Sequence, residues 1–201
     1  MTLDRAGWPF VLGLGAFTLV LYGFAPLLAV VGIILLVFTL NFFRDPQRRP
    51  PEDPGAFVSP ADGRIIRADG ERISIFMNVF DVHVCRSPVA GRVTSVVHEP
   101  GRFVAAMKDE ASEHNERTAI VVLTPEGNEV RFALVAGLIA RRIVCRVAAG
   151  RVLAAGERVG IIRFGSRVDL DLPPGTTLAV GVGDRVVAGN TVVARRGLRP
   201  A

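Results

Sequence analysis

The segment from Ala6 to Phe43 carries no charged residue, and it constrains the fold of this chain more than any other feature. A single membrane-spanning helix needs about 20 apolar residues, and this run is much longer. The stretch from Gly23 to Pro26 interrupts it near the middle, and proline disfavours helix in the residue that precedes it. The sequence therefore predicts two apolar helices joined at that break.

Cationic residues flank the apolar run on both sides. Arg5 precedes it, and Arg44, Arg48 and Arg49 follow it. Under the positive-inside rule this places both ends on the cytoplasmic side, which predicts a hairpin over residues 1–45. Whether the hairpin crosses the bilayer or only dips into it stays open. A cleaved signal peptide would need one short apolar core and a small-residue cleavage site, and "FFRDPQRRPP" ends this run instead. The stretch "RDPQRRPPEDPG" predicts an extended linker at the membrane surface.

Composition narrows the choice of partners. The formal net charge is +5, which can indicate nucleic acid or an anionic membrane. The apolar segment favours the membrane, and one Tyr and one Trp offer little for base stacking, so we expect no nucleic acid partner. Cys85 and Cys145 belong to no CxxC pair and no His/Cys cluster. We therefore expect two buried small hydrophobes in a reducing compartment, and no metal site.

The rest of the chain, residues 46–201, has the pattern of a mainly β domain. From residue 56 onward, short β-branched runs alternate with Gly, Pro, Asp and Asn, which predicts a β-sandwich or barrel-like domain. The stretch "TPEGNEV" (124–130) predicts a hairpin turn. Residues 105–117 predict either a helix or a polar loop.

Few polar groups in this apolar scaffold could carry chemistry. Asp62 lies in "SPADG", His83 lies in "NVFDVHVCRSP", and Gly165-Ser166 interrupts the strand-like "IIRFGSRVDL". Each has a structural alternative: Asp-Gly is a common turn pair, a histidine on a strand is often structural, and a glycine in a strand often marks a bulge. An Asp, a His and a Ser from separate strands can still meet in space.

Taken together, these segments resemble the phosphatidylserine decarboxylase family in its short bacterial form. The matching stretches keep the family's order, and they are "SPADG" (59–63), "FMNVFDVHVCRSPVAG" (76–91), "PGRF" (100–103), "NERT" (115–118), "GLIARRIV" (137–144) and "GIIRFGSRVDLDLP" (160–173). The resemblance implies an enzyme that decarboxylates phosphatidylserine to phosphatidylethanolamine at the cytoplasmic face of the cell membrane.

The resemblance also implies how the cofactor is made. The proenzyme would cut itself between Gly165 and Ser166, giving a β chain, 1–165, and an α chain, 166–201, which stay together as a heterodimer. Ser166 would become a pyruvoyl group that forms a Schiff base with the substrate amine and acts as the electron sink. Whether a higher oligomer forms, and which headgroups are accepted, stays open.

The match departs from the longer members of the family in two motifs. The cleavage motif is Gly-Ser-Arg, as in the short form, where the longer members have Gly-Ser-Thr or Gly-Ser-Ser. Longer members carry His-x-x-His and use an Asp-His-Ser triad for self-cleavage. Here the first histidine is His83, and the second position is Arg86. Either His83 takes over as the base, or Asp62 acts more directly, or cleavage uses another arrangement. Arg86 could bind the substrate carboxylate or phosphate, for which a guanidinium is suited.

Two other functions compete with this one. A membrane-tethered β-barrel could be a non-catalytic adaptor, which would remain one intact chain. A pyruvoyl decarboxylase of a soluble amino acid would keep the self-cleavage but would not need a membrane hairpin.

Overall fold

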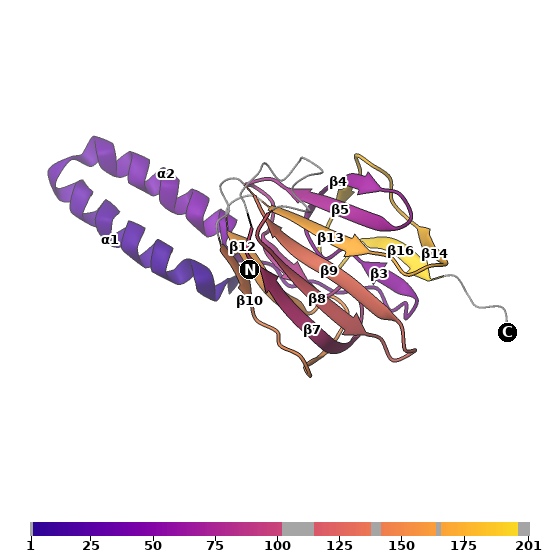
Figure 1. Cartoon of the computed structure of the whole chain (residues 1–201). Coiled ribbons are helices and arrows are strands. Elements are labelled where there is room, and N and C mark those ends of the chain that lie inside the picture. The colour runs from indigo at the N-terminus through magenta and orange to yellow at the C-terminus, as the bar shows by residue number, and fades with distance from the viewer. Residues whose placement is uncertain (1, 102–114, 138–141, 164–165, 197–201) are drawn as a thin grey trace. The chain divides into compact units, whose positions relative to one another are not determined.

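The computed structural model describes residues 2–101, 115–137, 142–163 and 166–196. The chain divides into two compact units, residues 1–47 and residues 48–201. Helices form most of the first unit, and strands form the second (Figure 1). The predicted mainly β architecture with an N-terminal apolar helical segment is confirmed. Most of the segment predicted to be a helix or a polar loop, residues 105–114, lies outside the described residues.

The N-terminal unit is a pair of apolar helices that begins and ends on a short strand pair. Its elements are β1 (Thr2–Leu3), the 3-10 helix η1 (Arg5–Gly7), α1 (Trp8–Phe24), α2 (Pro26–Phe42) and β2 (Arg44–Asp45), which pairs with β1. The helices meet at Ala25, whose φ of −150° is not helical. Pro26 is the first residue of α2, where a missing N–H costs nothing. The structure therefore confirms the predicted break between the two helices.

Small residues bring the two helices together. A Cβ added at Gly32 would lie 2.5 Å from Oγ1 of Thr18, so only glycine allows this close approach. Elsewhere the large apolar side chains point outward, as those of Phe24 and Leu27 do. The helix from Arg5 to Phe24 is long and apolar enough to cross a membrane, and α2 is apolar but shorter. An outward apolar surface of this kind suits lipid better than water.

The second unit, which we call the catalytic unit, is built on one large antiparallel sheet. Its eight strands have the order β11-β7-β8-β9-β13-β5-β4-β15. They are β4 (Gly63–Ala68), β5 (Arg72–Met77), β7 (Gly91–Glu99), β8 (Arg117–Leu123), β9 (Glu129–Ala136), β11 (Val152–Leu153), β13 (Ser166–Asp171) and β15 (Arg185–Val186). The turn predicted at 124–130 joins β8 to β9, where the Thr124 N–H donates to the Asn128 carbonyl.

Two three-stranded sheets complete the catalytic unit. One has the order β10-β12-β6, and its strands are β6 (Val84–Arg86), β10 (Arg142–Cys145) and β12 (Arg158–Arg163). The other has the order β14-β16-β3, and its strands are β3 (Ala56–Val58), β14 (Thr176–Leu178) and β16 (Val192–Arg196).

The core of the catalytic unit begins on the inner face of the central strand β13. Val168 pairs with Ile75 on β5 and with Leu134 on β9, and all three side chains are fully buried. The next row of the same face repeats this arrangement around Leu170. β-Branched and other apolar side chains at every second position therefore form one continuous core, and they hold β13 in register between β5 and β9.

Candidate active site at the junction of β12 and β13

The Gly-Ser pair does not interrupt a single strand. β12 ends at Arg163 in a three-stranded sheet, and β13 begins at Ser166 in the eight-stranded sheet. The strand partners of β12 are β10 and β6, whereas those of β13 are β5 and β9. A bulge adds a residue within one ladder, so a simple bulge in a continuous strand does not describe this segment. The chain changes sheets here, although residues 164 and 165 lie outside the described residues.

Ser166 occupies a fixed backbone position at the start of β13. It pairs with Met77 on one side and with Ala136 on the other. Both neighbours are fully buried. The backbones of these two neighbours lie about 4.8 Å away on either side, and their strand pairing holds the Ser166 backbone in place. We call this end of the catalytic unit, where β13 begins, the junction end.

His83 lies in the connection between β5 and β6 and reaches the same junction. Its carbonyl accepts the Ile162 N–H over 3.3 Å, which places it beside the last residues of β12. The side chain is fully buried. Its Nδ1 lies 2.9 Å from the carbonyl oxygen of Asp81, and because a carbonyl can only accept, Nδ1 carries the proton. The other nitrogen, Nε2, is then the basic one, which is the tautomer that a general base requires.

Asp62 lies at the junction end as well, immediately before β4. Its Oδ2 accepts from Arg48 over 2.9 Å, and its Oδ1 accepts the Ala188 N–H over 2.7 Å. Strands β4 and β13 lie on opposite sides of β5, so their backbones are about 10 Å apart. Two anchors therefore fix the Asp62 carboxylate near, but not on, the Ser166 strand.

Arg86 is the last residue of β6, and its N–H donates to the Pro60 carbonyl over 2.8 Å, two residues before Asp62. It pairs with Arg158 at the start of β12, about 16 Å along that strand from Arg163. Its guanidinium donates from Nη1 to the Gly156 carbonyl over 2.9 Å, and the side chain is nearly completely buried. The structure brings the backbones of Ser166 and His83 to one junction, with Asp62 at the same end. A substrate-binding role for Arg86 stays a prediction.

Asn115 is a residue at this end that the sequence analysis did not single out. Its side chain is buried, and Nδ2 donates to the Ala136 carbonyl over 2.7 Å. Ala136 is the residue that pairs with Ser166, so Asn115 anchors the strand end directly beside the junction. The only signal in the sequence was that Asn115 begins the "NERT" stretch.

Arg48 is the second residue that the sequence analysis missed. We expected residues 44–55 to form an extended linker at the membrane surface. Instead, Arg48 begins the catalytic unit, and its side chain is mostly buried against Asp62. A guanidinium from the predicted linker therefore forms part of the candidate site.

The two cysteines lie on strands that flank β12. Cys85 on β6 and Cys145 on β10 both pair with Gly160. Burial, and to a smaller extent the nearby charge of Asp62, raises the pKa of the Cys85 thiol, so it stays protonated and unreactive. Within the described ranges, no three His, Cys, Asp or Glu side chains lie close enough to hold a metal ion.

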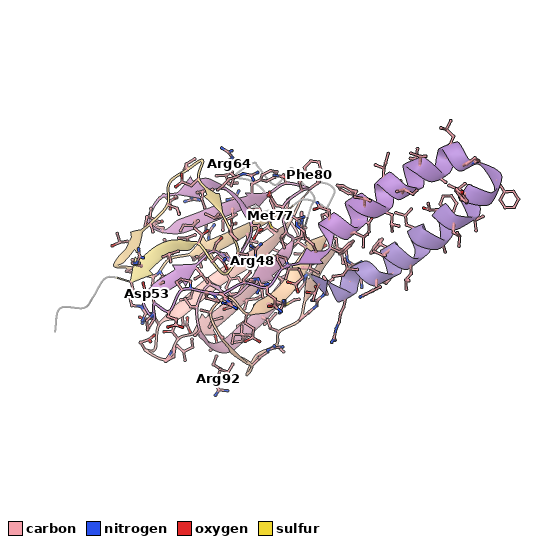
Figure 2. The ribbon with its side chains drawn as sticks, turned by 180° about the vertical axis from the view of Figure 1, so that it is seen from behind. Arg48, Asp53, Arg64, Met77, Phe80 and Arg92 are labelled. Carbon is pink, nitrogen blue, oxygen red and sulfur yellow. The ribbon has the colours of Figure 1, made fainter. Side chains whose placement is uncertain are left out.

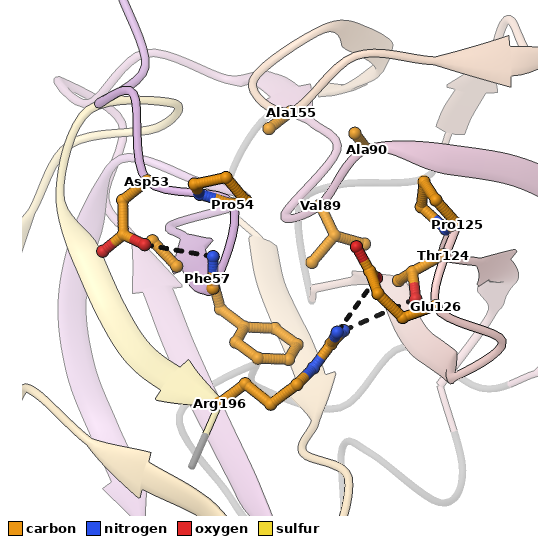
Figure 3. Close-up of a pocket in the computed structure, with 12 residues that line it drawn as sticks. Asp53, Pro54, Phe57, Val89, Ala90, Thr124, Pro125, Glu126, Ala155 and Arg196 are labelled. Carbon is orange, nitrogen blue, oxygen red and sulfur yellow. Dashed lines mark hydrogen bonds and ion pairs between the residues drawn. The ribbon is translucent and has the colours of Figure 1, made fainter. Parts of the chain in front are cut away.

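A pocket of about 160 Å³ lies elsewhere on the catalytic unit (Figure 3). Phe57 and Val89 form part of its apolar wall, and Arg196 closes one side by bonding to Glu126 and Thr124. The β8–β9 turn lines this pocket, at the opposite end of that hairpin from Ala136. None of the predicted site residues lines it, so it is not part of the junction.

The fold and junction define a mainly β protein with an apolar helical N-terminus, whose chain changes sheets at a Gly-Ser pair. The sequence profile of the phosphatidylserine decarboxylase family matches residues 35–69 and 66–194. The chain therefore belongs to the phosphatidylserine decarboxylase family. The predicted resemblance is confirmed, as is the prediction that the chain is a decarboxylase.

Curated relatives agree over nearly the whole chain. A phosphatidylserine decarboxylase proenzyme of Desulfotalea psychrophila is 46% identical over 202 residues, which cover 94% of each chain. Proteins of the same name from Pelobacter propionicus and Burkholderia multivorans are 45% and 46% identical, with at least 95% of each chain covered. The protein of that name from Nitratidesulfovibrio vulgaris is 50% identical over 84% of this chain and 82% of its own.

Proposed function

We propose that this chain decarboxylates phosphatidylserine to phosphatidylethanolamine, using a pyruvoyl group that it makes by cutting itself between Gly165 and Ser166. One observation carries the proposal beyond family membership. Ser166 begins a central strand whose backbone is held on both sides, and His83 lies beside the strand that leads into the junction. A cut at this point frees the first residue of β13 without removing the pairing of β13 with either neighbour.

The residue types suit such a cut. The Ser166 hydroxyl attacks the Gly165 carbonyl, the C–N bond breaks, and an ester replaces the amide. Glycine before the bond leaves room for the approach, since it has no Cβ. His83 accepts the hydroxyl proton at Nε2, because its Nδ1–H is committed to the Asp81 carbonyl. Elimination then breaks the Cβ–O bond, releases the Gly165 carboxylate and leaves dehydroalanine, and addition of water gives ammonia and the pyruvoyl ketone.

The position of residue 166 fits the pyruvoyl group. Its neighbours on β5 and β9 are fully buried, so a ketone there would lie at the edge of the core. When present, the pyruvoyl group supplies an electron-withdrawing carbonyl that takes up the electron pair left as carbon dioxide departs. The chain's own groups then have two tasks. The β5 and β9 strands keep residue 166 in place, and His83 returns a proton to the substrate carbon.

The remaining parts of the proposal concern location and assembly. The N-terminal hairpin holds the enzyme at the membrane that contains its lipid substrate, with the catalytic unit on the cytoplasmic side. The products of the cut, 1–165 and 166–201, stay together as a heterodimer, because β13 lies between two strands of the other product. Asp62 supports the cleavage from its fixed position at the junction end, either through His83 or directly.

Intact mass of the purified chain, with and without Ser166→Ala, tests the proposal. We expect the wild type to give two fragments that meet at Gly165, the second blocked at its N-terminus, and the alanine variant to stay whole. Decarboxylation is then measured on phosphatidylserine vesicles and on free serine, and we expect turnover of the lipid alone.

Each of the other outcomes would favour a different function for this chain. A wild-type chain that stays whole under native conditions would overturn the self-cleavage and favour the non-catalytic adaptor, against which family membership argues. A cut chain that turns over free serine would instead favour a decarboxylase of a soluble amino acid.

A further inference from the structure

Strand β13 carries a completely buried arginine directly after its first residue. Arg167 has no exposed surface, although it lies on the face of β13 opposite to the one that carries the core residues Val168 and Leu170. Moving a guanidinium out of water is costly, and well-packed apolar residues in place of a buried ion pair are often at least as stable. A buried charge at this position therefore indicates a role other than stability.

The Arg167 guanidinium bridges two strands. Its Nε donates to Oδ1 of Asp169 on the same strand over 2.6 Å, and its Nη2 donates to Oγ of Ser74 on β5 over 2.7 Å. Asp169 and Ser74 pair with each other across the two strands, and both are buried. We call Arg167, Asp169 and Ser74 the β13 clamp. It ties the second residue of β13 to β5, next to Met77, the partner of Ser166, which lies inside the catalytic unit (Figure 2).

The clamp distinguishes strand registers that the core face leaves similar. The core face of β5 carries three large apolar residues in succession, namely Ile73, Ile75 and Met77. A shift of β13 by two residues would therefore still place an apolar side chain of β5 opposite Val168. On the other face of β5, Ser74 lies between Arg72 and Phe76, so the same shift would bring a different side chain opposite Asp169 and break the clamp.

The proposed cut makes this register vulnerable, and the present inference rests on the proposed function in that respect. Before the cut, the peptide bond to Gly165 ties residue 166 to the chain that leads from β12. After the cut, residue 166 is a chain end, and chain ends open more readily than the interior of a strand. A two-residue shift would move the pyruvoyl carbonyl by about 6.7 Å, whereas a misplacement of about 1 Å can cost about 100-fold in rate.

We propose that Arg167 is a positioning residue for decarboxylation, which keeps the pyruvoyl end of the α chain in register on β5 after the cut. The guanidinium acts through the strand and not on the substrate, because its bonds lead along β13 to Asp169, three residues from the cut. Self-cleavage itself does not need the clamp, since the uncut chain already holds residue 166 in place.

The variant Arg167→Met tests the proposal, because methionine fills much of the space but cannot donate a hydrogen bond. The rate of fragment appearance, the mass of the α chain, which reports whether the pyruvoyl group has formed, and kcat and KM on phosphatidylserine vesicles are measured. We expect self-cleavage within about threefold of the wild-type rate and a complete pyruvoyl group, with kcat lower by about 100-fold and KM within about twofold. Arg167→Lys, which keeps the charge, should restore part of kcat.

A matched control comes from the same pair of strands. Arg72 on β5 donates from Nε to Oδ1 of Asp171 on β13 over 2.6 Å, at the opposite end of this pairing from Ser166. Its side chain is 34% exposed. We expect Arg72→Met to leave kcat near the wild-type value. An equal fall in kcat in both methionine variants would show that any ion pair between these strands has the same effect, which contradicts the proposal.

Hydrogen exchange separates positioning of the chain end from a general loss of stability. In the cut Arg167→Met enzyme, we expect the amides of residues 167–169 to exchange at least about tenfold faster than in the cut wild type. With Ser166→Ala added to both, the chains stay whole, and the same amides should differ by no more than about threefold. Equal acceleration in the cut and whole chains would show a purely structural role and would overturn the proposal.

The remaining outcomes are also decisive. A cut Arg167→Met enzyme with wild-type kcat would show that the clamp does not position the ketone, and a folded variant that is not cut would assign Arg167 to self-cleavage instead. If Arg167→Met does not fold, Ser74→Ala replaces it, because it removes the acceptor on β5 and leaves the pair with Asp169; wild-type kcat there overturns the proposal. A wild-type chain that stays whole would overturn the proposed function, and this proposal with it.

Discussion

Arg48 donates from Nη2 to Oδ2 of Asp62 over 2.9 Å, and this ion pair joins the start of the catalytic unit to the end of the large sheet where Ser166 lies. The Arg48 side chain is 15% exposed and the Asp62 side chain is 14% exposed. A largely buried pair of this kind fixes geometry more than it adds stability, because desolvation offsets much of its attraction. The pair therefore connects the segment that follows the membrane hairpin to a candidate catalytic carboxylate.

Removing the Arg48 guanidinium should slow self-cleavage more than it lowers stability. In Arg48→Met, Asp62 loses one of its two anchors and keeps the Ala188 N–H, so we expect cleavage to be about tenfold slower, or about 1.4 kcal/mol in the barrier. Arg48→Lys should restore part of the rate, and Arg49→Met, at an exposed neighbour, should leave it unchanged. The measurement is a time course of fragment appearance. Equal self-cleavage rates in the Arg48→Met and Arg49→Met variants would show that Arg48 does not position Asp62 for cleavage.

His83→Gln should nearly abolish self-cleavage. A glutamine retains much of the side-chain volume but cannot take the serine proton, and a general base contributes about 100-fold to 10,000-fold. His98→Gln is the control, since His98 is more than half exposed and lies on β7 with its Nδ1 near Thr118. Cleavage of both variants is followed on gels after synthesis, and circular dichroism reports on folding. A folded His83→Gln chain that cuts itself at the wild-type rate would assign the base to another residue.

Gly63→Ala should destabilise the chain strongly. Gly63 follows Asp62 at φ +151°, and an added Cβ would lie 2.1 Å from the Phe76 carbonyl oxygen. We expect a loss of about 3 kcal/mol in the free energy of unfolding. Gly70→Ala has a positive φ but no atom within 4 Å of the added Cβ, so its loss should be about 1 kcal/mol.

Urea denaturation of both glycine variants in the Ser166→Ala background, which keeps one chain per molecule, measures the difference. Similar losses at the two positions would mean that the backbone conformation alone, and not the contact with Phe76, sets the cost.

The two cysteines should react with alkylating reagents at very different rates. Burial raises the pKa of Cys85 and excludes reagent, whereas Cys145 is partly exposed. At pH 8 in the native state we expect iodoacetamide to modify Cys145 at least tenfold faster, because only an accessible thiolate reacts. Peptide mass spectrometry before and after unfolding checks this. Native modification of Cys85 at a comparable rate would contradict the closed packing around β6.

Local patterns in the sequence were enough to predict the parts of this fold that depend on neighbouring residues. The break at Ala25-Pro26 follows from the fixed φ and missing N–H of proline. The β8–β9 turn follows from a glycine, which has φ +81° at Gly127. The mainly β content follows from short β-branched runs. Each of these depends on the conformational preferences of a few consecutive residues.

The candidate site could be predicted only in part. Ser166, His83 and Asp62 were recognised because they belong to stretches that resemble the family, and the structure places all three at one end of the sheet. Arg86 was expected to bind the substrate, and that role stays a prediction. No pattern near Arg48 or Asn115 indicated that they would lie beside that end.

By itself, the sequence determined that this chain has an apolar helical hairpin, a β-rich unit and a Gly-Ser pair in a family-like setting. Only the tertiary structure decided that the Gly-Ser pair joins two different sheets and that Arg48 leaves the linker to hold Asp62. The reason is physical. Helix breaks and turns are set by local dihedral preferences, whereas these arrangements depend on strand pairings between segments far apart in the chain, whose register is chosen by burial of the whole core.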